Sequence, residues 1–236
     1  FKEFVRRMKA RGLGARIADP REFAYRDGAL YIEEEKIDIV YRRATTARVM
    51  AHYEEVQDFI RAYREGAVCV IGGFRSQVIH NKMIFAVLHG KANQSMFSEA
   101  EKRFIRAHVP FTEVLTGENM HKYINEADCW LLKPFDQYGA HGIHMGRDMD
   151  AAAWRQAVTE CAASGDYLVQ AACRVPRLPM LTIEEDRAYF EPYNYLIGLF
   201  QYNEAFAGFY SRAGRRHIIA SHGGEACTVP NFVERP

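Results

Sequence analysis

The sequence has no long apolar run and almost no net charge. A membrane-spanning helix needs about 18 consecutive apolar residues, and no such stretch occurs here. Lys and Arg total 31 and Asp and Glu total 30 among the 236 residues, so the formal net charge is +1. No overall charge therefore attracts the chain to nucleic acid or to an acidic membrane. We expect neither a nucleic acid nor a membrane among its partners.

Closely spaced cysteines are also absent. The five cysteines are widely separated and form no Cys-x-x-Cys pair: Cys69, Cys129, Cys161, Cys173 and Cys227. Zinc sites and thioredoxin-like redox sites use such pairs, so the sequence supports neither. Four of the five lie among apolar residues, which is typical of buried, reduced thiols. We therefore expect a cytoplasmic protein.

The composition is that of a folded globular protein. Apolar residues make up 48% and charged residues 26%. This excludes a disordered chain, because disorder requires low hydrophobicity and high net charge. The length allows one large domain or two small ones. Helix and strand patterns are mixed, and strands dominate the C-terminal end, so the sequence predicts an α+β fold.

The spacing of apolar residues predicts the individual elements. Helices are expected in the first dozen residues and in 46–64, 78–88, 98–107, 116–126 and 150–163. Strands are expected in 37–42, 67–71, 129–132, 143–146, 167–170, 188–202, 206–211 and 218–219. Asp27-Gly28 between two apolar runs predicts a hairpin turn. The prolines and acidic residues of 176–186 predict an exposed loop.

Two features near the C-terminus have structural interpretations. Five aromatic residues are predicted to pack within a sheet rather than to line a ligand site: Phe190, Tyr193, Tyr195, Phe200 and Tyr202. His217 follows Arg215-Arg216 in a predicted turn, where we expect it to be solvated.

A lysine at the end of a buried strand is the most informative feature. Lys133 follows Trp130-Leu131-Leu132 directly, and a loop with Gly139 and Gly142 comes next. Backbone N–H groups of a glycine-bearing loop can converge on phosphate oxygens, and a lysine at its root adds positive charge. The order differs from the P-loop, where the lysine follows the glycines. The alternative is an ordinary β-hairpin with glycine at its turn.

Two further polar residues are candidates for a nucleotide site that includes this loop. Gln170 interrupts an apolar strand, where a nucleotide site would offer backbone groups to an adenine edge. A core strand with its glutamine at an edge is the alternative. Lys82 begins the helix predicted for 78–88. It is either a solvated helix lysine or a second phosphate ligand.

The order of these motifs resembles that of the circularly permuted ATP-grasp enzymes, and in particular the glutathionylspermidine-synthase-like ligases. The motifs that carry the resemblance are Asp38, Tyr41-Arg42-Arg43, Phe74-Arg75-Ser76, Asn81-Lys82, 109–112, Leu132-Lys133-Pro134 with its loop, 206–212 and 229–232. The resemblance runs from about residue 37 to the C-terminus. It implies a permuted ATP-grasp domain over 37–236, and we expect 1–36 to be the remnant of a longer N-terminal region.

The resemblance also implies a reaction. Enzymes of this kind hold ATP and magnesium between two α+β lobes. They phosphorylate a carboxylate, and an amine then attacks the acyl phosphate to give an amide. The expected substrates are therefore a carboxylate and an amine, carried by small molecules or peptides.

Individual roles follow from the same resemblance. Lys82 and Lys133 would hold the ATP phosphates, and a flexible loop of Asp136, Gly139, Ala140, His141 and Gly142 would close over them. Gln170, Ala172 and Cys173 would lie at the adenine. Arg212 would stabilise charge on the transferred phosphate, Asp38 would help to hold magnesium, and Arg43 and Arg75 would bind a substrate carboxylate or a phosphate.

The sequence departs from the family pattern at two places. Gly139-Ala140 replaces a Gly-Gly pair, and Gly72 stands where an asparagine normally binds the metal. Glu191 or Asn194 would then have to supply the missing ligand. The alternative is a degenerate ATP-grasp protein that binds nucleotide without ligase activity. A third interpretation is an α+β interaction domain whose glycine loop is only a hairpin.

Overall fold

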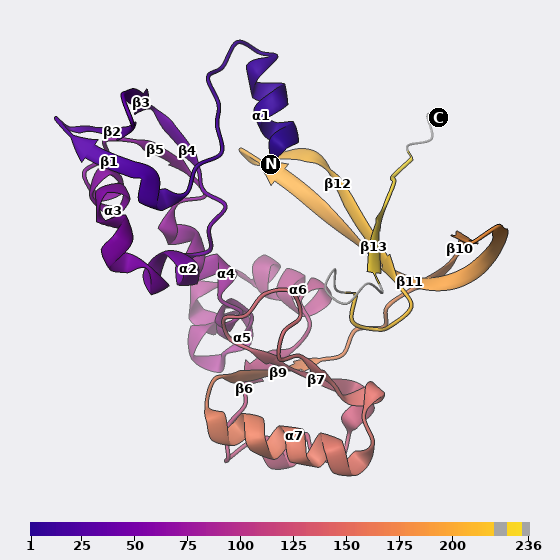
Figure 1. The fold of residues 1–236 in the computed structure, drawn as a ribbon. Helices are drawn as coiled ribbons and strands as arrows, with labels where there is room; N and C mark the ends of the chain where they lie inside the picture. Colours follow the sequence, from indigo (N-terminus) through magenta and orange to yellow (C-terminus); the bar gives the residue numbers. More distant parts are fainter. Residues whose placement is uncertain (220–225, 233–236) are drawn as a thin grey trace. The chain divides into compact units, whose positions relative to one another are not determined.

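The chain folds into two compact units, Phe1–Ile79 and His80–Pro236 (Figure 1). The structure, a computed structural model, describes residues 1–219 and 226–232. Both units combine helices with small sheets, which confirms the expected α+β class. This division by compactness falls at residue 79, and the domain division expected at residue 37 stays a prediction.

The N-terminal unit contains two small sheets. Strands β1 (Phe23–Arg26), β2 (Ala29–Ile32) and β3 (Glu35–Ile37) form an antiparallel meander, and β4 (Ile39–Tyr41) pairs in parallel with β5 (Cys69–Ile71). The helices are α1 (Lys2–Lys9), α2 (Thr46–Ala51) and α3 (Gln57–Arg64). Asp27 (φ 50°) and Gly28 (φ 73°) make the predicted hairpin turn. Leu30 and Phe59 form the centre of a small core.

Two elements predicted in this unit are each divided. The strand expected over 37–42 is two strands, because a bend at Asp38 ends β3 and the next residues pair in the other sheet. The helix expected over 46–64 is interrupted at His52 (φ −117°, ψ 30°). A 3-10 turn, Tyr53–Val56, separates α2 from α3.

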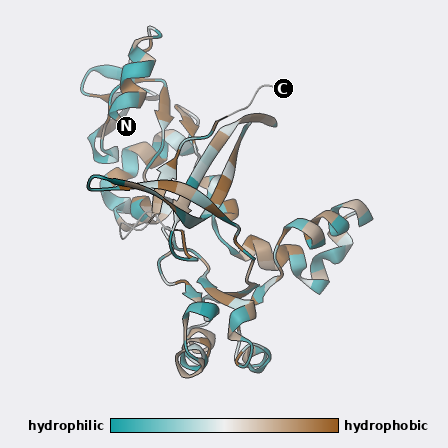
Figure 2. Cartoon of the chain, turned by 90° about the vertical axis from the view of Figure 1, so that its right-hand side faces the viewer, coloured by the Kyte–Doolittle hydropathy of each residue, from teal (hydrophilic) through white to brown (hydrophobic). Residues whose placement is uncertain are grey.

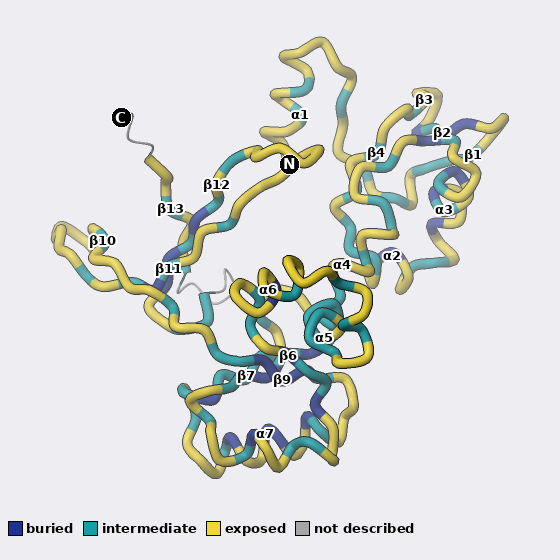
Figure 3. Tube along the Cα trace, turned by 180° about the vertical axis from the view of Figure 1, so that it is seen from behind, coloured by how far each residue is buried: buried dark blue, intermediate teal, exposed yellow. Residues whose placement is uncertain are grey.

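The second unit is built around an antiparallel sheet in the order β6-β9-β7-β8. Its strands are β6 (Thr112–Val114), β7 (Trp130–Pro134), β8 (His144–Met145) and β9 (Tyr167–Ala171). The predicted hairpin between β7 and β8 is confirmed. Helix α7 (Ala151–Ser164) covers one face, and α5 (Met83–His89) and α6 (Glu99–His108) lie on the other side (Figures 1 and 3).

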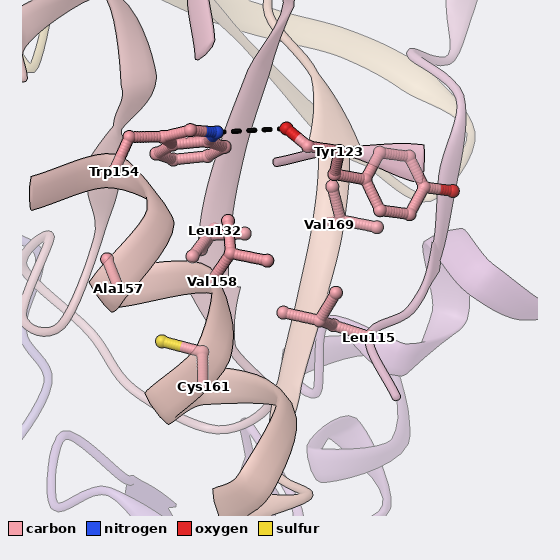
Figure 4. Packing of buried hydrophobic residues seen from close by; sticks show 8 residues of the cluster. All are labelled: Leu115, Tyr123, Leu132, Trp154, Ala157, Val158, Cys161 and Val169. Carbon is pink, nitrogen blue, oxygen red and sulfur yellow. Dashed lines mark hydrogen bonds between the residues drawn. The ribbon is translucent and has the colours of Figure 1, made fainter. Parts of the chain in front are cut away.

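The core of this unit lies between α7 and the sheet (Figure 4). Leu132 of β7 and Val169 of β9 point toward Val158 of the helix, and all three are completely buried. The indole Nε1 of Trp154 donates to the carbonyl oxygen of Tyr123 at 2.9 Å. Asp150 caps α7, because its side chain accepts from the backbone N–H groups of the first turn. This packing fixes which face of β7 and β9 points away from α7.

Two other predicted helices differ from expectation. The helix over 78–88 is divided into α4 (Gln77–His80) and α5, because the backbone turns at Asn81-Lys82 and the backbone N–H of Lys82 donates to the carbonyl of Phe135 at 2.9 Å. The segment 116–126 contains only a 3-10 turn, Met120–Lys122. The capping box of Ser98 and Glu101 starts α6 as predicted.

The C-terminal part forms a second antiparallel sheet in the order β10-β11-β12-β13. Its strands are β10 (Arg177–Glu184), β11 (Arg187–Tyr202), β12 (Ala205–Gly214) and β13 (Ala226–Val229). The exposed loop expected over 176–186 is mostly β10, since an edge strand tolerates a proline such as Pro179. The short strand expected at 218–219 does not form.

Burial differs from expectation in this sheet and at the cysteines. Apolar residues recur along these strands (Figure 2), yet Phe190 is 73%, Phe200 55% and Tyr202 70% exposed. The prediction that the aromatic cluster packs within the sheet is therefore wrong for Phe190 and Tyr202, whereas the Phe200 ring lies 6.1 Å from that of Tyr210 on β12. Of the cysteines, only Cys161 is buried, so that prediction is also wrong. Among the described residues, no helix combines the length and apolar character needed to cross a bilayer.

We predict that Gly146→Ala destabilises the fold by about 1–3 kcal/mol, as overpacking of a dense core does. A Cβ atom at Gly146 would overlap the carbonyl group of Ala127, which is backbone and does not move aside easily. Chemical denaturation measures the free energy of unfolding. Gly117→Ala is the matched control, because nothing lies within 4 Å of a Cβ atom there. Equal stabilities of the two variants would contradict the packing described here.

Candidate functional site

Lys133 lies on the face of the sheet that points away from α7. Successive side chains of a strand alternate between faces, so Lys133 of β7 lies opposite to Leu132, which is in the core. Leu131 pairs with Gln170 of β9 in the register of the sheet, which makes Lys133 and Gln170 diagonal neighbours on the same face. The Lys133 Nζ donates to the Gln170 Oε1 at 2.7 Å.

Gln170 is in turn held by Thr112. These two residues are direct partners across β6 and β9. The Gln170 Nε2 donates to the Thr112 Oγ1 at 2.8 Å, and the Thr112 hydroxyl donates to the carbonyl oxygen of Pro110 at 2.9 Å. Gln170 is 5% and Thr112 is 1% exposed. A continuous hydrogen-bond chain therefore runs from the Lys133 ammonium to the backbone.

Lys82 lies at the first turn of α5 and contacts the start of the glycine loop. Its Nζ donates to the carbonyl oxygen of Gln137, and its backbone N–H holds Phe135. The neighbouring His80 Nε2 lies 3.4 Å from the Asp136 carboxylate. The segment between α4 and α5 thus anchors residues 135–137, where the loop leaves β7.

The two lysines create a concentration of positive charge. Burial lowers the pKa of the Lys133 ammonium below that of an ordinary lysine, the charge of Lys82 lowers it further, and Cys173 acts in the opposite direction. Burial also lowers the pKa of Lys82, while Asp136 raises it. Within the described part of the chain, no carboxylate lies within ion-pair distance of Lys133. Two neighbouring ammonium groups in this setting fit a polyphosphate.

The glycine loop contains a run of left-handed backbone. Gly139 has φ 64°, Ala140 φ 64° and Gly142 φ 69°. An alanine in this conformation is disfavoured by roughly 1–2 kcal/mol, which gives a physical reason for a glycine at position 140 in the family pattern. At Gly142 a Cβ atom would also lie 2.9 Å from the Tyr167 hydroxyl and 3.2 Å from the Pro134 ring. His141 lies on the loop with its ring 6.0 Å from that of Tyr138.

The residues expected at the adenine have different environments. The Gln170 amide is buried and fully engaged with Lys133 and Thr112, so its side chain is directed to the lysine. The backbone N–H of Ala172 donates to the carbonyl of Cys129 at 2.8 Å. Cys173 is exposed. The sequence singled out Gln170 as a polar residue in an apolar strand, and Thr112 only as part of the motif 109–112, without a role of its own.

Arg212 lies on β12, in the C-terminal sheet. Its Nε donates to the Tyr210 hydroxyl at 2.6 Å, and its guanidinium carbon lies 4.9 Å from the centre of the Tyr210 ring. The hydrogen bonds from Thr228 and Arg212 lower the pKa of Tyr210. Arg212 is half-buried, and its planar group is held in one orientation by the ring.

The basic residues that follow Arg212 make contacts that hold the turn after β12. Arg215 forms ion pairs with Glu191 at 2.9 Å and with Glu184 at 2.7 Å. Asn194 is buried and donates to the carbonyl oxygens of Arg215 and Arg216. The His217 Nδ1 lies 2.6 Å from the Asp148 carboxylate, and the histidine side chain is 40% exposed, so it is both partly solvated and paired.

The remaining candidates, Asp38, Arg43 and Arg75, lie in the N-terminal unit. Arg43 and Arg75 are exposed, and Arg43 lies 5.8 Å from the ring of Tyr41. Their neighbour Arg42 donates to the carbonyl of Gly72 at 2.6 Å and thereby holds the turn after β5. The candidates near Lys133 all belong to the second unit. Asp38, Arg43 and Arg75 belong to the first unit.

The candidate metal ligands do not form a complete magnesium site by themselves. Magnesium prefers octahedral oxygen coordination and is usually held by one or two carboxylates together with waters and substrate phosphates. The exposed Asp38 carboxylate lies 3.5 Å from the Lys36 ammonium, and Glu191 is paired with Arg215. Gly72 has no side chain to offer. Across residues 1–219 and 226–232, no three Asp, Glu, His or Cys side chains gather as a possible cation site.

Comparison with known proteins gives one family match. Residues 4–208 match the family described as circularly permuted ATP-grasp type 2. Among solved structures, one described as the ATP-grasp ligase PsnB complexed with minimal precursor is similar, with a TM-score of 0.49 and 14% sequence identity over 90% of this chain and 70% of that chain. No curated protein matches the sequence.

We predict that Lys133 loses its proton at a lower pH in the folded chain than in the unfolded chain. The protonated form therefore opposes folding, and the free energy of unfolding should rise with pH between the two pKa values. Heteronuclear NMR of the lysine Nζ and Cε nuclei, with Lys133→Arg for assignment, measures both titrations. Equal pKa values in the native and the urea-unfolded chain would contradict the burial of this charge.

Proposed function

Because the chain belongs to the circularly permuted ATP-grasp type 2 family, we propose that it is an ATP-dependent carboxylate–amine ligase of the glutathionylspermidine-synthase-like kind. The observation that carries the proposal is the pair of neighbouring lysines at the root of the glycine loop. Lys133 and Lys82 are close enough for the charge of one to lower the pKa of the other. A bound polyphosphate would relieve this repulsion, because its oxygens accept hydrogen bonds from both ammonium groups.

The proposed reaction has two steps. A carboxylate oxygen attacks the γ-phosphorus of ATP, the bond to the β,γ-bridging oxygen breaks, and ADP leaves. The amine nitrogen then attacks the carbonyl carbon of the acyl phosphate, inorganic phosphate leaves, and the nitrogen loses a proton to give the amide. Both substrates are proposed to be small molecules or peptides.

The residues of this chain have distinct tasks in the proposal. Lys82 and Lys133 bind and orient the phosphates, and the loop of Asp136, Gly139, Ala140, His141 and Gly142 covers them and excludes water. Excluding water matters, because an acyl phosphate would otherwise be hydrolysed. Backbone groups of Ala172 and Cys173 are proposed to lie at the adenine.

Three arginines are proposed to act on the acidic substrate and on the transferred group. Arg212 would stabilise the negative charge that develops during phosphoryl transfer, because its planar guanidinium offers several N–H donors. Arg43 and Arg75 would bind a substrate carboxylate. Asp38 is proposed to help hold magnesium, which would add positive charge beside the phosphates of ATP when bound.

We predict that Lys133→Ala and Lys82→Ala each weaken ATP binding at least tenfold, which corresponds to ~1.4 kcal/mol. Isothermal titration with a non-hydrolysable ATP analogue measures the affinity. Lys122→Ala is the control, since Lys122 is an exposed lysine of the same unit. Unchanged affinity in both site variants would refute the proposed nucleotide site.

The same titration separates the ligase from the degenerate ATP-grasp alternative. It is repeated with and without magnesium, using the wild-type chain. A ligase is expected to bind the nucleotide at least tenfold more tightly with magnesium and to release ADP when carboxylates and amines are supplied. Binding that ignores magnesium, with no such release, would favour nucleotide binding without ligase activity. No binding under either condition would leave an interaction domain as the better explanation.

We predict that Arg212→Ala lowers turnover about 100-fold, as loss of one donor to a developing charge does, while ATP affinity changes less than threefold. Carboxylate-dependent ADP release gives turnover, and calorimetry gives affinity. Arg187→Ala, an exposed arginine of β11, is the control. Equal losses of turnover and affinity would instead assign Arg212 to ground-state binding.

A further inference from the structure

We propose that Gln170 and Thr112 are positioning residues that hold the Lys133 ammonium at the phosphate site without neutralising it. This inference rests on the proposed function and deepens it, because it assigns how one ligand of that site is oriented. Gln170 then acts through the lysine, rather than by touching the nucleotide itself.

The first argument is the register of the sheet. Strand β9 lies between β6 and β7, and Gln170 is its penultimate residue. Thr112 is its direct partner on one side, and Lys133 is its diagonal neighbour on the other. All three side chains therefore lie on the face opposite to the α7 core. A shift of register by one residue would point all of them into the core.

The second argument is the direction of the hydrogen bonds. A threonine hydroxyl has a single proton, and the Thr112 hydroxyl donates it to the carbonyl oxygen of Pro110. The Thr112 Oγ1 then presents only lone pairs to Gln170, so the amide must turn its NH2 group toward Thr112. Its oxygen is left facing Lys133. The Lys133 ammonium can only donate, so Thr112 and Lys133 together set the orientation of the Gln170 amide.

The third argument is burial, which adds to these constraints. Gln170 and Thr112 are almost completely shielded from solvent, so breaking the hydrogen bond between them would leave a buried polar atom without its partner. This penalty favours keeping the Gln170 amide in place beside Lys133.

The fourth argument is charge. A carboxylate at position 170 would form an ion pair with Lys133 and cancel its charge at the place where phosphate is proposed to bind. An amide oxygen accepts one N–H bond from the ammonium and carries no charge. A lysine has three such donors, so two remain for other acceptors. The neutral Gln170 amide therefore orients the Lys133 ammonium and leaves its positive charge available to an anion.

The test compares four variants in the full chain: Thr112→Val, Thr112→Ser, Gln170→Glu and Lys133→Ala. Thr112→Val keeps the shape but removes the acceptor for the amide, and we expect ATP affinity to fall about tenfold (~1.4 kcal/mol). Thr112→Ser restores the hydroxyl and should restore affinity to within about twofold (~0.4 kcal/mol). Gln170→Glu should weaken ATP binding at least tenfold and raise the pH at which Lys133 titrates. Calorimetry with ATP and with adenosine shows whether the effect depends on the phosphates.

A structural role alone would not produce this pattern. We expect adenosine affinity to be unchanged in all variants, and the Thr112→Val effect to vanish when Lys133 is already alanine. Equal losses for ATP and adenosine, or full losses in the Lys133→Ala background, would overturn the inference. If Thr112→Val does not fold, Gln170→Glu decides by itself, and unchanged ATP affinity with an unchanged Lys133 titration would overturn it.

Failure of the proposed function can be told apart from failure of this inference. If the wild-type chain binds no ATP, the proposed function fails. The NMR titration of Lys133 still tests the positioning, because Thr112→Val and Gln170→Glu are expected to shift it without any nucleotide. If the wild-type chain binds ATP and the variants bind it equally well, only the inference fails.

Discussion

The site depends on keeping a lysine charged on a partly buried surface beside a second lysine. Burial and the neighbouring Lys82 both act against the protonated form of Lys133. The hydrogen bond that the Lys133 Nζ donates to Gln170 favours the protonated form, and the core behind β7 holds the strand that carries the lysine. The protonated form of Lys133 is disfavoured in the free chain, and a bound anion would favour it. Such perturbed pKa values are common at binding sites.

The core opposite this face explains why the lysine is held so firmly. Leu132 and Val169 are completely buried against α7, so neither β7 nor β9 can rotate or slip without exposing them. The helix is itself capped by Asp150 and pinned by the Trp154 hydrogen bond. Apolar packing on one face thus determines the polar geometry on the other.

Local patterns predicted much of the fold. The hairpin at Asp27-Gly28, the capping box at Ser98 and the strand expected at 129–132, which is β7 (Trp130–Pro134), were all correct, because each depends on neighbours in sequence. The breaks at His52 and at Asn81-Lys82 were missed, since tertiary contacts impose them on segments with unbroken helical patterns. Strand β10 was missed because its prolines suggested a loop, although they are tolerated at the edge of a sheet.

The site was predicted less completely than the fold. The resemblance to the circularly permuted ATP-grasp enzymes is confirmed at the level of the family, while the subgroup and the residue roles stay predictions. Lys133 and Gln170 were identified as polar residues in apolar strands. Their hydrogen bond, and the part played by Thr112, follow from strand register, which one sequence does not reveal.

The attachment of the glycine loop to Lys82 has a consequence for conformational entropy. Because the backbone and the side chain of Lys82 hold Phe135 and Gln137, the first residues after β7 are already ordered. The segment 138–143 makes the turns that then lead the chain into β8. If the loop closes over a phosphate as proposed, these anchors reduce the entropy that closure loses, because ordering a shorter segment loses less entropy.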